Sequence, residues 1–470
     1  MRKLPQGLPD NIDKLKAQLE AQSQKSRITQ VREYRIITAL FGGGVEPNHA
    51  DPITVVRATE VRGHLRFWWR ATRGGQYATL AELQAAEAAI WGTAATPNGK
   101  VGQSAVWVEV EVLERGEPLT VRWTKRRELQ PPSCDVGDPS SPLSYVAFPL
   151  REEKDETGTS KSPQPVLSMV RFAVTFSYVE QVEVPSLPTP LVVATELDAA
   201  LWAWETFGGI GARTRRGFGA LRCESINGKP NTYLPPATRE RVLAWLDEKL
   251  REYGVVQQNL KEDNVPLLPM AFNNDNCWVG TIANNNHHAK PIAEQDAVNT
   301  WVGLFTKMKE FRQQRKKSNP PGRNRWPEPD AIRRLTKRRS RRHGNDVSDV
   351  DKFPRAAFGL PMQFKFKDSD DPDGKNPLLP KQDKEVLERF ASPLILKPLA
   401  CSDGVIGLAL ILANTAVPTT LSIETSRGKK NVSSDLTSDE AVKLKRVDNE
   451  EPLLGTETDV LKAFLRFLQR

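Results

Sequence analysis

The order of strand-like and helix-like segments in the first 230 residues constrains the fold of this chain more than any other feature. In chain order the segments are a strand at 31–40, helices at 58–73 and 80–91, strands at 105–112 and 168–178, a helix at 195–207 and a strand at 220–226. The helical segments carry apolar residues at helical spacing, and the strands are β-branched or alternate apolar with polar residues. If the two early helices count as one, the order is strand–helix–strand–strand–helix–strand, that of a ferredoxin-like domain.

The second half of the chain is less regular. A helix at 235–253, with proline near its start and Gly254 after its end, opens it. Further segments are helices at 295–314 and 456–469 and strands at 362–366, 393–399 and 405–413. Surface loops are expected at 116–164, 367–383 and 427–440, and a tail or short helix at 1–30. We predict an α+β chain with one domain at 31–230 and a second, diverged domain at 231–470.

Several features exclude whole classes of protein. No stretch of the 470 residues approaches the roughly 18–20 apolar residues of a membrane span, and the N-terminus lacks the apolar core of a secretion signal. The four cysteines include no C-x-x-C pair, so buried thiols are expected rather than a zinc site or disulfides. We predict a cytoplasmic protein with no metal, no cofactor and no membrane partner.

The positive charge of the chain is concentrated in one block, residues 307–342. This block holds fifteen Lys and Arg against three acidic residues, a net of +12, whereas the whole chain has +9 and the remainder is therefore near neutral at −3. Such a block indicates a polyanionic partner. The alternative is a solvated loop without a partner, because runs of like charge are often only that. Within the block, Asp330 is expected to cap a helix at 332–339.

The most informative segment is FGGIGARTRRGFGAL at 207–221, which we call the glycine–arginine loop. Its glycines let the backbone approach a ligand, and its arginines supply planar donors for phosphate. It has no Gly-Lys-Ser/Thr, and Thr214 occupies the last glycine place of G-x-G-x-x-G, so neither nucleotide motif is present. The alternative is a tight turn with exposed arginines.

A second constellation lies at 41–73. Arg62, Arg66 and Arg70 recur at helical spacing and share one face next to a triple glycine, which suits a phosphate backbone. Trp68 is expected in the core rather than stacked on a base. His49 and His64 are the candidates for acid–base cleavage of RNA, but neither is paired with a nucleophile in the sequence.

Five segments together resemble the RAMP superfamily of CRISPR–Cas proteins. They are FGGGVEPNHADPITVVRATEVRGHLRFWWRATRGG at 41–75, FGGIGARTRRGFGAL at 207–221, RWPEPDAIRR at 325–334, FPRAAFGLPMQFKF at 353–366 and ASPLILKP at 391–398. More narrowly, they resemble the first subunits of the Cmr complex, the type III-B RNA-guided effector. Segment 116–164 and the last fifty residues carry no part of the resemblance.

The resemblance implies two ferredoxin-like, RRM-related domains in tandem with long inserted loops. It implies a non-catalytic subunit near the 3′ end of the CRISPR guide RNA, in contact with the guide, its target single-stranded RNA and other Cmr subunits, in antiviral defence. The family's target nuclease, cyclase and DNase functions belong to other subunits. Carried onto this chain, the RNA-binding candidates are Gly42, Gly43, Gly44, Arg57, Arg62, Arg66, Arg70, Gly208, Gly209, Gly211, Arg213, Arg215, Arg216, Gly217, Gly219, Arg325, Arg333 and Arg334.

Two other functions stay open on the sequence. One is an endoribonuclease of the same superfamily that processes CRISPR RNA with His49 or His64. The other is a structural subunit that touches only protein, with its basic block paired to acidic partners. The first predicts RNA cleavage without metal, and the second predicts no contact with RNA.

Overall fold

We describe the protein in a computed structural model of the chain. The described residues are 27–45, 50–51, 53–93, 102–119, 166–256, 265–282, 293–316, 322–340, 345–366, 368–374, 376–383 and 385–470. His49, Cys134, most of the predicted loop 116–164 and nearly all of the predicted tail 1–30 lie outside them. In the part of the chain that is described, no helix is long and apolar enough to cross a membrane.

A five-stranded antiparallel sheet forms the first half. Its strands are β1 Ile28–Ile36, β2 Val106–Glu114, β5 Arg171–Tyr178, β8 Leu221–Ile226 and β9 Lys229–Pro230, in the spatial order β2-β5-β1-β8-β9. β1 pairs with β5 on one side and with β8 on the other. Two small two-stranded sheets pair β3 Glu117–Leu119 with β4 Val166–Ser168 and β6 Gln181–Val182 with β7 Leu191–Val192.

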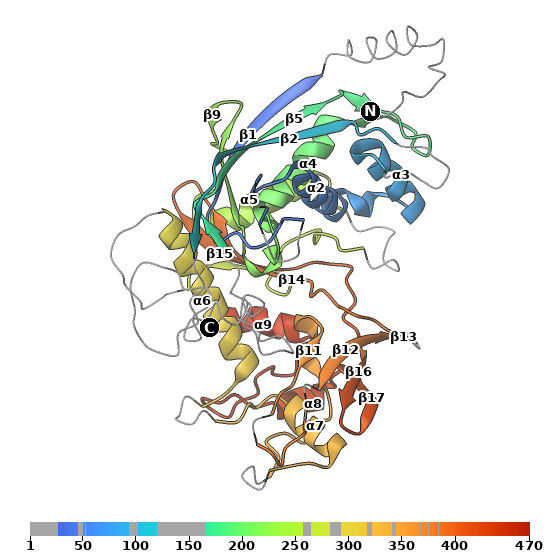
Figure 1. Cartoon of the computed structure of the whole chain (residues 1–470), viewed down its shortest axis with the longest axis vertical. Helices are drawn as coiled ribbons and strands as arrows, with labels where there is room; N and C mark the ends of the chain where they lie inside the picture. Colours follow the sequence, from blue (N-terminus) through green and yellow to red (C-terminus); the bar gives the residue numbers. More distant parts are fainter. Residues whose placement is uncertain are drawn as a thin grey trace, which may run out of the picture.

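Helices cover one face of this sheet (Figure 1). They are α2 Ala58–Arg73, α3 Leu80–Trp91, α4 Val193–Phe207 and α5 Arg239–Glu252. Tyr34 of β1 is fully buried against Trp204 of α4, with ring centroids 5.3 Å apart, and Trp68 of α2 lies 5.9 Å from Phe207. Trp68 is thus in the core, as predicted.

The second half holds two further antiparallel sheets. One is β10 Cys277–Gly280, β15 Val405–Ile411 and β14 Leu394–Ala400, in that order; the other is β11 Met362–Gln363, β12 Pro377–Gln382, β16 Thr420–Thr425 and β17 Gly428–Ser433, with β13 Glu385–Val386 on β12. The helices are α6 Ala293–Gln313, α7 Glu328–Thr336, α8 Ser438–Lys443 and α9 Val460–Leu468. α6 packs on β14 and β15. α7, α8 and the sheet that contains β16 and β17 lie at the end of the molecule away from the sheet of the first half (Figure 1).

The hydrophobic core continues from one half into the other. One cluster joins Tyr34 and Trp204 of the first half to Ile395 and Leu408 of the second. A second cluster joins Phe41 and Phe218 to Trp301, Phe311 and Phe464. The elements of both halves therefore share buried surface, and the boundary at residue 230 stays a prediction.

The mixed α and β content, the antiparallel sheets and the element order of the first half agree with the sequence prediction, but several details were wrong. The helix predicted at 195–207 begins two residues earlier, because α4 starts at Val193. Asp330 is buried inside α7, which begins at Glu328, so it is not a cap residue. The predicted loops 427–440 and 367–383 contain β17, the start of α8 and β12.

Candidate nucleic-acid interface

The glycine–arginine loop leaves the C-terminal end of α4 and returns as β8. The Gly208 N–H donates to the Trp204 carbonyl, and the Ile210 N–H donates to the Gly219 carbonyl, both at 2.9 Å. A short 3-10 helix, Thr214–Arg216, forms the tip. The loop is thus closed at its base and presents its arginines together at the tip.

Close packing inside the chain requires the glycines of this loop. Gly211 has φ of +85°, and a Cβ there would lie 2.6 Å from the Phe41 carbonyl oxygen. Gly217 has φ of +76°, and its Cβ would lie 2.6 Å from the indole nitrogen of Trp301. A side chain at either place would be strained and would collide with its neighbours. A Cβ at Gly208, Gly209 or Gly219 would also collide, since the nearest atom would lie 2.4, 2.7 and 1.8 Å away, respectively. Packing therefore explains these glycines without a ligand.

Two arginines of the loop bind backbone carbonyls of the second half. Arg215 Nη1 donates to the Ser392 carbonyl at 2.8 Å, and its guanidinium lies 5.3 Å from the ring of Phe67. Arg216 donates to the carbonyls of Leu394 and Phe358, both at 2.8 Å. These partners come from two of the segments that carry the family resemblance. The loop therefore fastens those segments to the first half.

The positive charge of the loop is not offset by these carbonyls, because a carbonyl is neutral. Burial, together with the nearby charge of Arg389, lowers the pKa of Arg213 to about 10, and burial lowers the pKa of Arg215. A lowered arginine pKa means that its surroundings disfavour the charged form. An anion placed here would relieve that cost.

The triple glycine and the start of α2 lie against this loop. Arg57 donates to the carbonyls of Gly43 and Gly44, both at 3.0 Å. The N–H of Gly211 donates to Glu60 Oε1 at 2.7 Å, and His64 Nε2 lies 3.8 Å from the same oxygen. The structure thus brings the two predicted constellations together, with Glu60 as the link between them.

The basic stripe of α2 is only partly open to a ligand. Arg66 and Arg70 both donate to Glu87 Oε1 of α3, at 2.8 Å and 2.5 Å. Arg62 Nε is buried and has no hydrogen-bond partner among the described residues. Glu87 therefore neutralises part of the charge of Arg66 and Arg70, and their contact with a phosphate stays a prediction.

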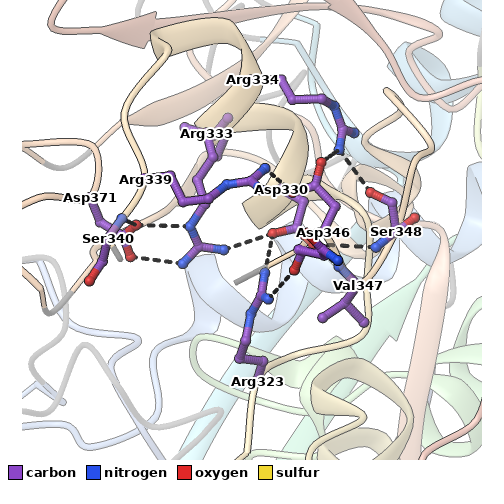
Figure 2. A network of polar contacts seen from close by, with 12 residues as sticks. Arg323, Asp330, Arg333, Arg334, Arg339, Ser340, Asp346, Val347, Ser348 and Asp371 are labelled. Carbon is purple, nitrogen blue, oxygen red and sulfur yellow. Dashed lines mark hydrogen bonds and ion pairs between the residues drawn. The ribbon is translucent and has the colours of Figure 1, made fainter. Parts of the chain in front are cut away.

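The basic block of the second half is a network of ion pairs (Figure 2). Arg333 is buried and donates to both oxygens of Asp371, at 3.0 Å and 2.8 Å, and to Asp330 at 2.9 Å. Arg323 also donates to Asp330, at 2.5 Å. Desolvation lowers the pKa of Arg333, but its bonds to Asp371 and Asp330 outweigh this and raise the pKa above the usual value.

Further arginines of this network have carboxylate partners as well. Arg334 pairs with Asp346 and Asp351, each at 2.7 Å, Arg325 with Glu450 at 2.5 Å, Arg338 with Asp373, and Arg339 with Asp346. Five carboxylates outside the block, Asp346, Asp351, Asp371, Asp373 and Glu450, therefore offset part of its local +12. Among the described residues, the block is an internal scaffold more than an exposed cationic surface, and Arg325, Arg333 and Arg334 belong to that scaffold.

Three residues of this region were not among the site residues predicted from the sequence. Lys397 is fully buried and donates to the carbonyls of Gly208 at 2.8 Å and Glu205 at 3.2 Å. Neither Glu60 nor Arg389 was predicted as a site residue. They are recognised only in the structure, where segments that are far apart in the sequence come into contact.

Metal and thiol chemistry have no support in the described residues. They contain no group of three or more His, Cys, Asp or Glu that could hold a metal ion. Cys223, Cys277 and Cys401 are free and buried, as expected, and desolvation raises the pKa of each thiol. Such thiols are poor nucleophiles.

The first half thus combines an antiparallel sheet with helices, and its glycine–arginine loop follows α4. Residues 33–222 match the family model of the RAMP superfamily. This confirms over that segment the superfamily that the motifs predicted.

Several solved structures are similar to the chain. One is the crystal structure of Cmr1 from Pyrococcus furiosus in its apo form, with 16% identity, 83% of this chain and 89% of that chain covered, and a TM-score of 0.41. Another is a chain of the type III-B Cmr-beta complex bound to cognate target RNA, with 13% identity, 82% and 95% coverage and a TM-score of 0.43. No curated protein matches the chain.

Proposed function

We propose that this protein is a non-catalytic, RNA-binding subunit of a type III-B CRISPR–Cas effector, and that the glycine–arginine loop is its main phosphate contact. The observation that carries the proposal is a cluster of arginines whose pKa is lowered, inside the segment that matches the RAMP superfamily. Guide RNA or target single-stranded RNA supplies the anion, and other Cmr subunits are the protein partners.

The proposal narrows the set of contact residues. Arg213 at the tip is the principal phosphate contact, with Arg215 and Arg389 adding charge and Arg57 and Arg62 flanking it. The glycines hold the loop in place and need not touch RNA. Arg325, Arg333 and Arg334 act by supporting the second half, since each is paired with a carboxylate.

We also propose that the second half is a diverged ferredoxin-like domain, which would give two such domains in tandem. In support, β10, α6, β14 and β15 occur in that chain order as strand, helix, strand and strand, with α7 and the strands β11, β12 and β13 inserted between α6 and β14. The sheet order β10-β15-β14 is the one that the first three strands of that fold adopt. The fourth strand is not among the strands paired with this sheet in the described residues.

The direct test is the affinity of the full chain for single-stranded RNA. The double variant Arg213→Gln/Arg215→Gln should bind at least about tenfold more weakly, because phosphate contacts dominate such binding. Arg338→Gln/Arg339→Gln makes the same change in net charge within the block and should bind within about twofold of the wild type. Equal losses in both variants would contradict the loop assignment.

The non-catalytic role has a separate test. Purified protein incubated with CRISPR repeat RNA in EDTA should leave the RNA intact. RNA cleavage that is lost in His64→Ala would instead support the endoribonuclease function. Crosslinking of the assembled effector without any RNA adduct on this chain would support a purely structural subunit.

A further inference from the structure

The strand β2 forms one edge of the sheet of the first half. β5 pairs with it on one side, and no described strand pairs with it on the other. Its sequence, VWVEVEVLE, contains neither proline nor glycine. Soluble proteins usually shorten, twist or cover such an edge, because its unpaired N–H and C=O groups can pair with another chain. The outer edge of β2 is not used by the function proposed above.

The backbone groups of alternate residues of β2 point away from the sheet. The N–H of Val179, just after β5, donates to the carbonyl of Ala105, just before β2, at 3.3 Å, so the odd-numbered residues of β2 face β5. Val106 faces the other way, since its N–H and C=O both bond the Ser104 hydroxyl. Three valines share the outward direction of Val106, and no hydrogen bond joins their backbone to another described segment: Val108, Val110 and Val112.

The side chains of β2 alternate between two chemically different rows. The three valines point toward the helices: Val108 is 7% exposed, and the other two are partly buried against the core. Glu109 and Glu111 point to the opposite face and are exposed. At the start of that face, the Arg27 guanidinium already lies 3.9 Å from the ring of Trp107. A strand laid along the free edge would therefore meet an apolar row on one face and carboxylates on the other.

The charge of the two glutamates selects among possible occupants of the edge. Opposite Glu109 and Glu111 on β5 stand Thr175 and Ala173, which carry no charge. A nucleic acid would be repelled by the two carboxylates. An antiparallel second copy of β2 would place glutamate beside glutamate, and like charges directly opposite each other destabilise a sheet. A protein segment with Lys or Arg at alternate positions has the complementary charge.

We propose that the outer edge of β2 docks an extended segment of a partner protein, in which apolar residues alternate with Lys or Arg. The segment adds a strand to the sheet. Its apolar residues face the helices beside the three valines. Its cations lie opposite Glu109 and Glu111, at non-hydrogen-bonded positions, where opposed side chains are closest. β8, into which the glycine–arginine loop runs, lies on the other side of β1 from β2, so the proposal does not rest on RNA binding.

The test uses the end-blocked, fluorescent peptide KVKVKVK, titrated with the full chain and followed by anisotropy. The peptide should bind saturably. N-methylation of its valines removes the N–H groups that face β2 and should weaken binding at least about tenfold. N-methylation of its lysines removes only N–H groups on the far side and should weaken binding less than about threefold. Val110→Pro removes an outward N–H of β2 and should also weaken binding.

Charge reversal tests the role of the glutamates. In Glu109→Lys/Glu111→Lys, affinity for KVKVKVK should fall about tenfold, and the acidic peptide EVEVEVE should bind in its place, because the attractive cross-strand pairs become repulsive and the repulsive ones attractive. Binding of EVEVEVE also shows that the variant is folded. Glu240→Lys/Glu248→Lys makes the same change in net charge on the exposed side of α5 and should bind KVKVKVK like the wild type.

The proposal fails if KVKVKVK does not bind saturably, if its two N-methylated forms bind alike, or if the charge-reversed protein still prefers KVKVKVK to EVEVEVE. A wild-type dimer that Val110→Pro dissociates would assign the edge to a second copy of the chain. Weaker binding of single-stranded RNA by Val110→Pro would assign it to nucleic acid. Either of these two results overturns the proposal as well.

Discussion

Two arginine-rich regions of this molecule look alike in the sequence and differ in their chemistry. In the glycine–arginine loop, Arg215 and Arg216 donate to neutral carbonyls, and burial lowers the pKa of Arg215. In the basic block, Arg333 and Arg334 bind carboxylates, which raise their pKa values against the effect of desolvation. The larger cluster of charge in the sequence is therefore the better neutralised one, and the smaller cluster is the better candidate for an anion.

The largest expected effect concerns the buried pair of the block. In Asp371→Asn, Arg333 keeps its charge and loses its bidentate partner inside the protein, so we expect a loss of about 3 kcal/mol in the free energy of unfolding. Urea denaturation of the full chain measures it. Asp373→Asn is the matched control, since Asp373 is 60% exposed and its pair with Arg338 should contribute less than about 1 kcal/mol. Equal losses in the free energy of unfolding of the two variants would contradict the claim that the buried ion pair contributes more than the exposed one.

The next effect concerns Lys397 at the root of the loop. Desolvation, opposed only in part by Glu205, lowers the pKa of Lys397 to about 7 in the folded protein, whereas an unfolded lysine has a pKa of about 10.4. Between these values the unfolded chain binds a proton that the folded chain does not. Stability from this group therefore rises with pH above about 7, by up to about 1.4 kcal/mol per pH unit, and is lowest below it.

Unfolding of wild type and Lys397→Met between about pH 6 and pH 9 checks this sign. The wild type should gain stability relative to the variant as the pH rises above 7. Buried thiols and tyrosines titrate in both proteins, so their contributions cancel in the difference. Parallel pH profiles would show that Lys397 titrates as an ordinary lysine.

The comparison of the two regions also predicts a gain of RNA binding. Glu87 forms ion pairs with Arg66 and Arg70, whose side chains are 37% and 33% exposed. If the α2 stripe borders the RNA, Glu87→Gln should raise the affinity for single-stranded RNA about threefold by freeing positive charge. Asp346→Asn frees arginines of the block in the same way and should leave the affinity unchanged, as measured by fluorescence anisotropy. A gain in Asp346→Asn alone would reverse the assignment.

An element of the fold could be predicted from the sequence where residues close to it in the chain determine its structure. The bounds of α2 and α3 were predicted to the residue, because apolar spacing defines the helices and Gly92 adopts φ of +77° just after α3. β17 was missed because its sequence, GKKNVS, is polar and it forms a strand by antiparallel pairing with β16. The ion pairs of the block could not be predicted, because Asp371, for example, lies 38 residues from Arg333.

The candidate interface followed the same rule. Residue types pointed to the loop and helical spacing pointed to the helix with Arg62, and the structure brings both beside Glu60. Contacts within the chain explain Gly211, which packs on Phe41, and Gly217, which packs on Trp301. Arg216 likewise donates to the Leu394 carbonyl. These contacts could not be predicted, because the partners are remote in the sequence. A motif rich in glycine and arginine can thus be shaped by its own chain as much as by a ligand.

The salt dependence of RNA binding tests the central claim most directly. For the full chain and a single-stranded RNA, the slope of log affinity against log salt concentration should become shallower by about 0.7 in Arg213→Gln, the value for one phosphate contact. Arg338→Gln removes the same charge from the block and should keep the wild-type slope. Equal slopes in wild type and Arg213→Gln, or a change confined to Arg338→Gln, would contradict the assignment of the anion site to the glycine–arginine loop.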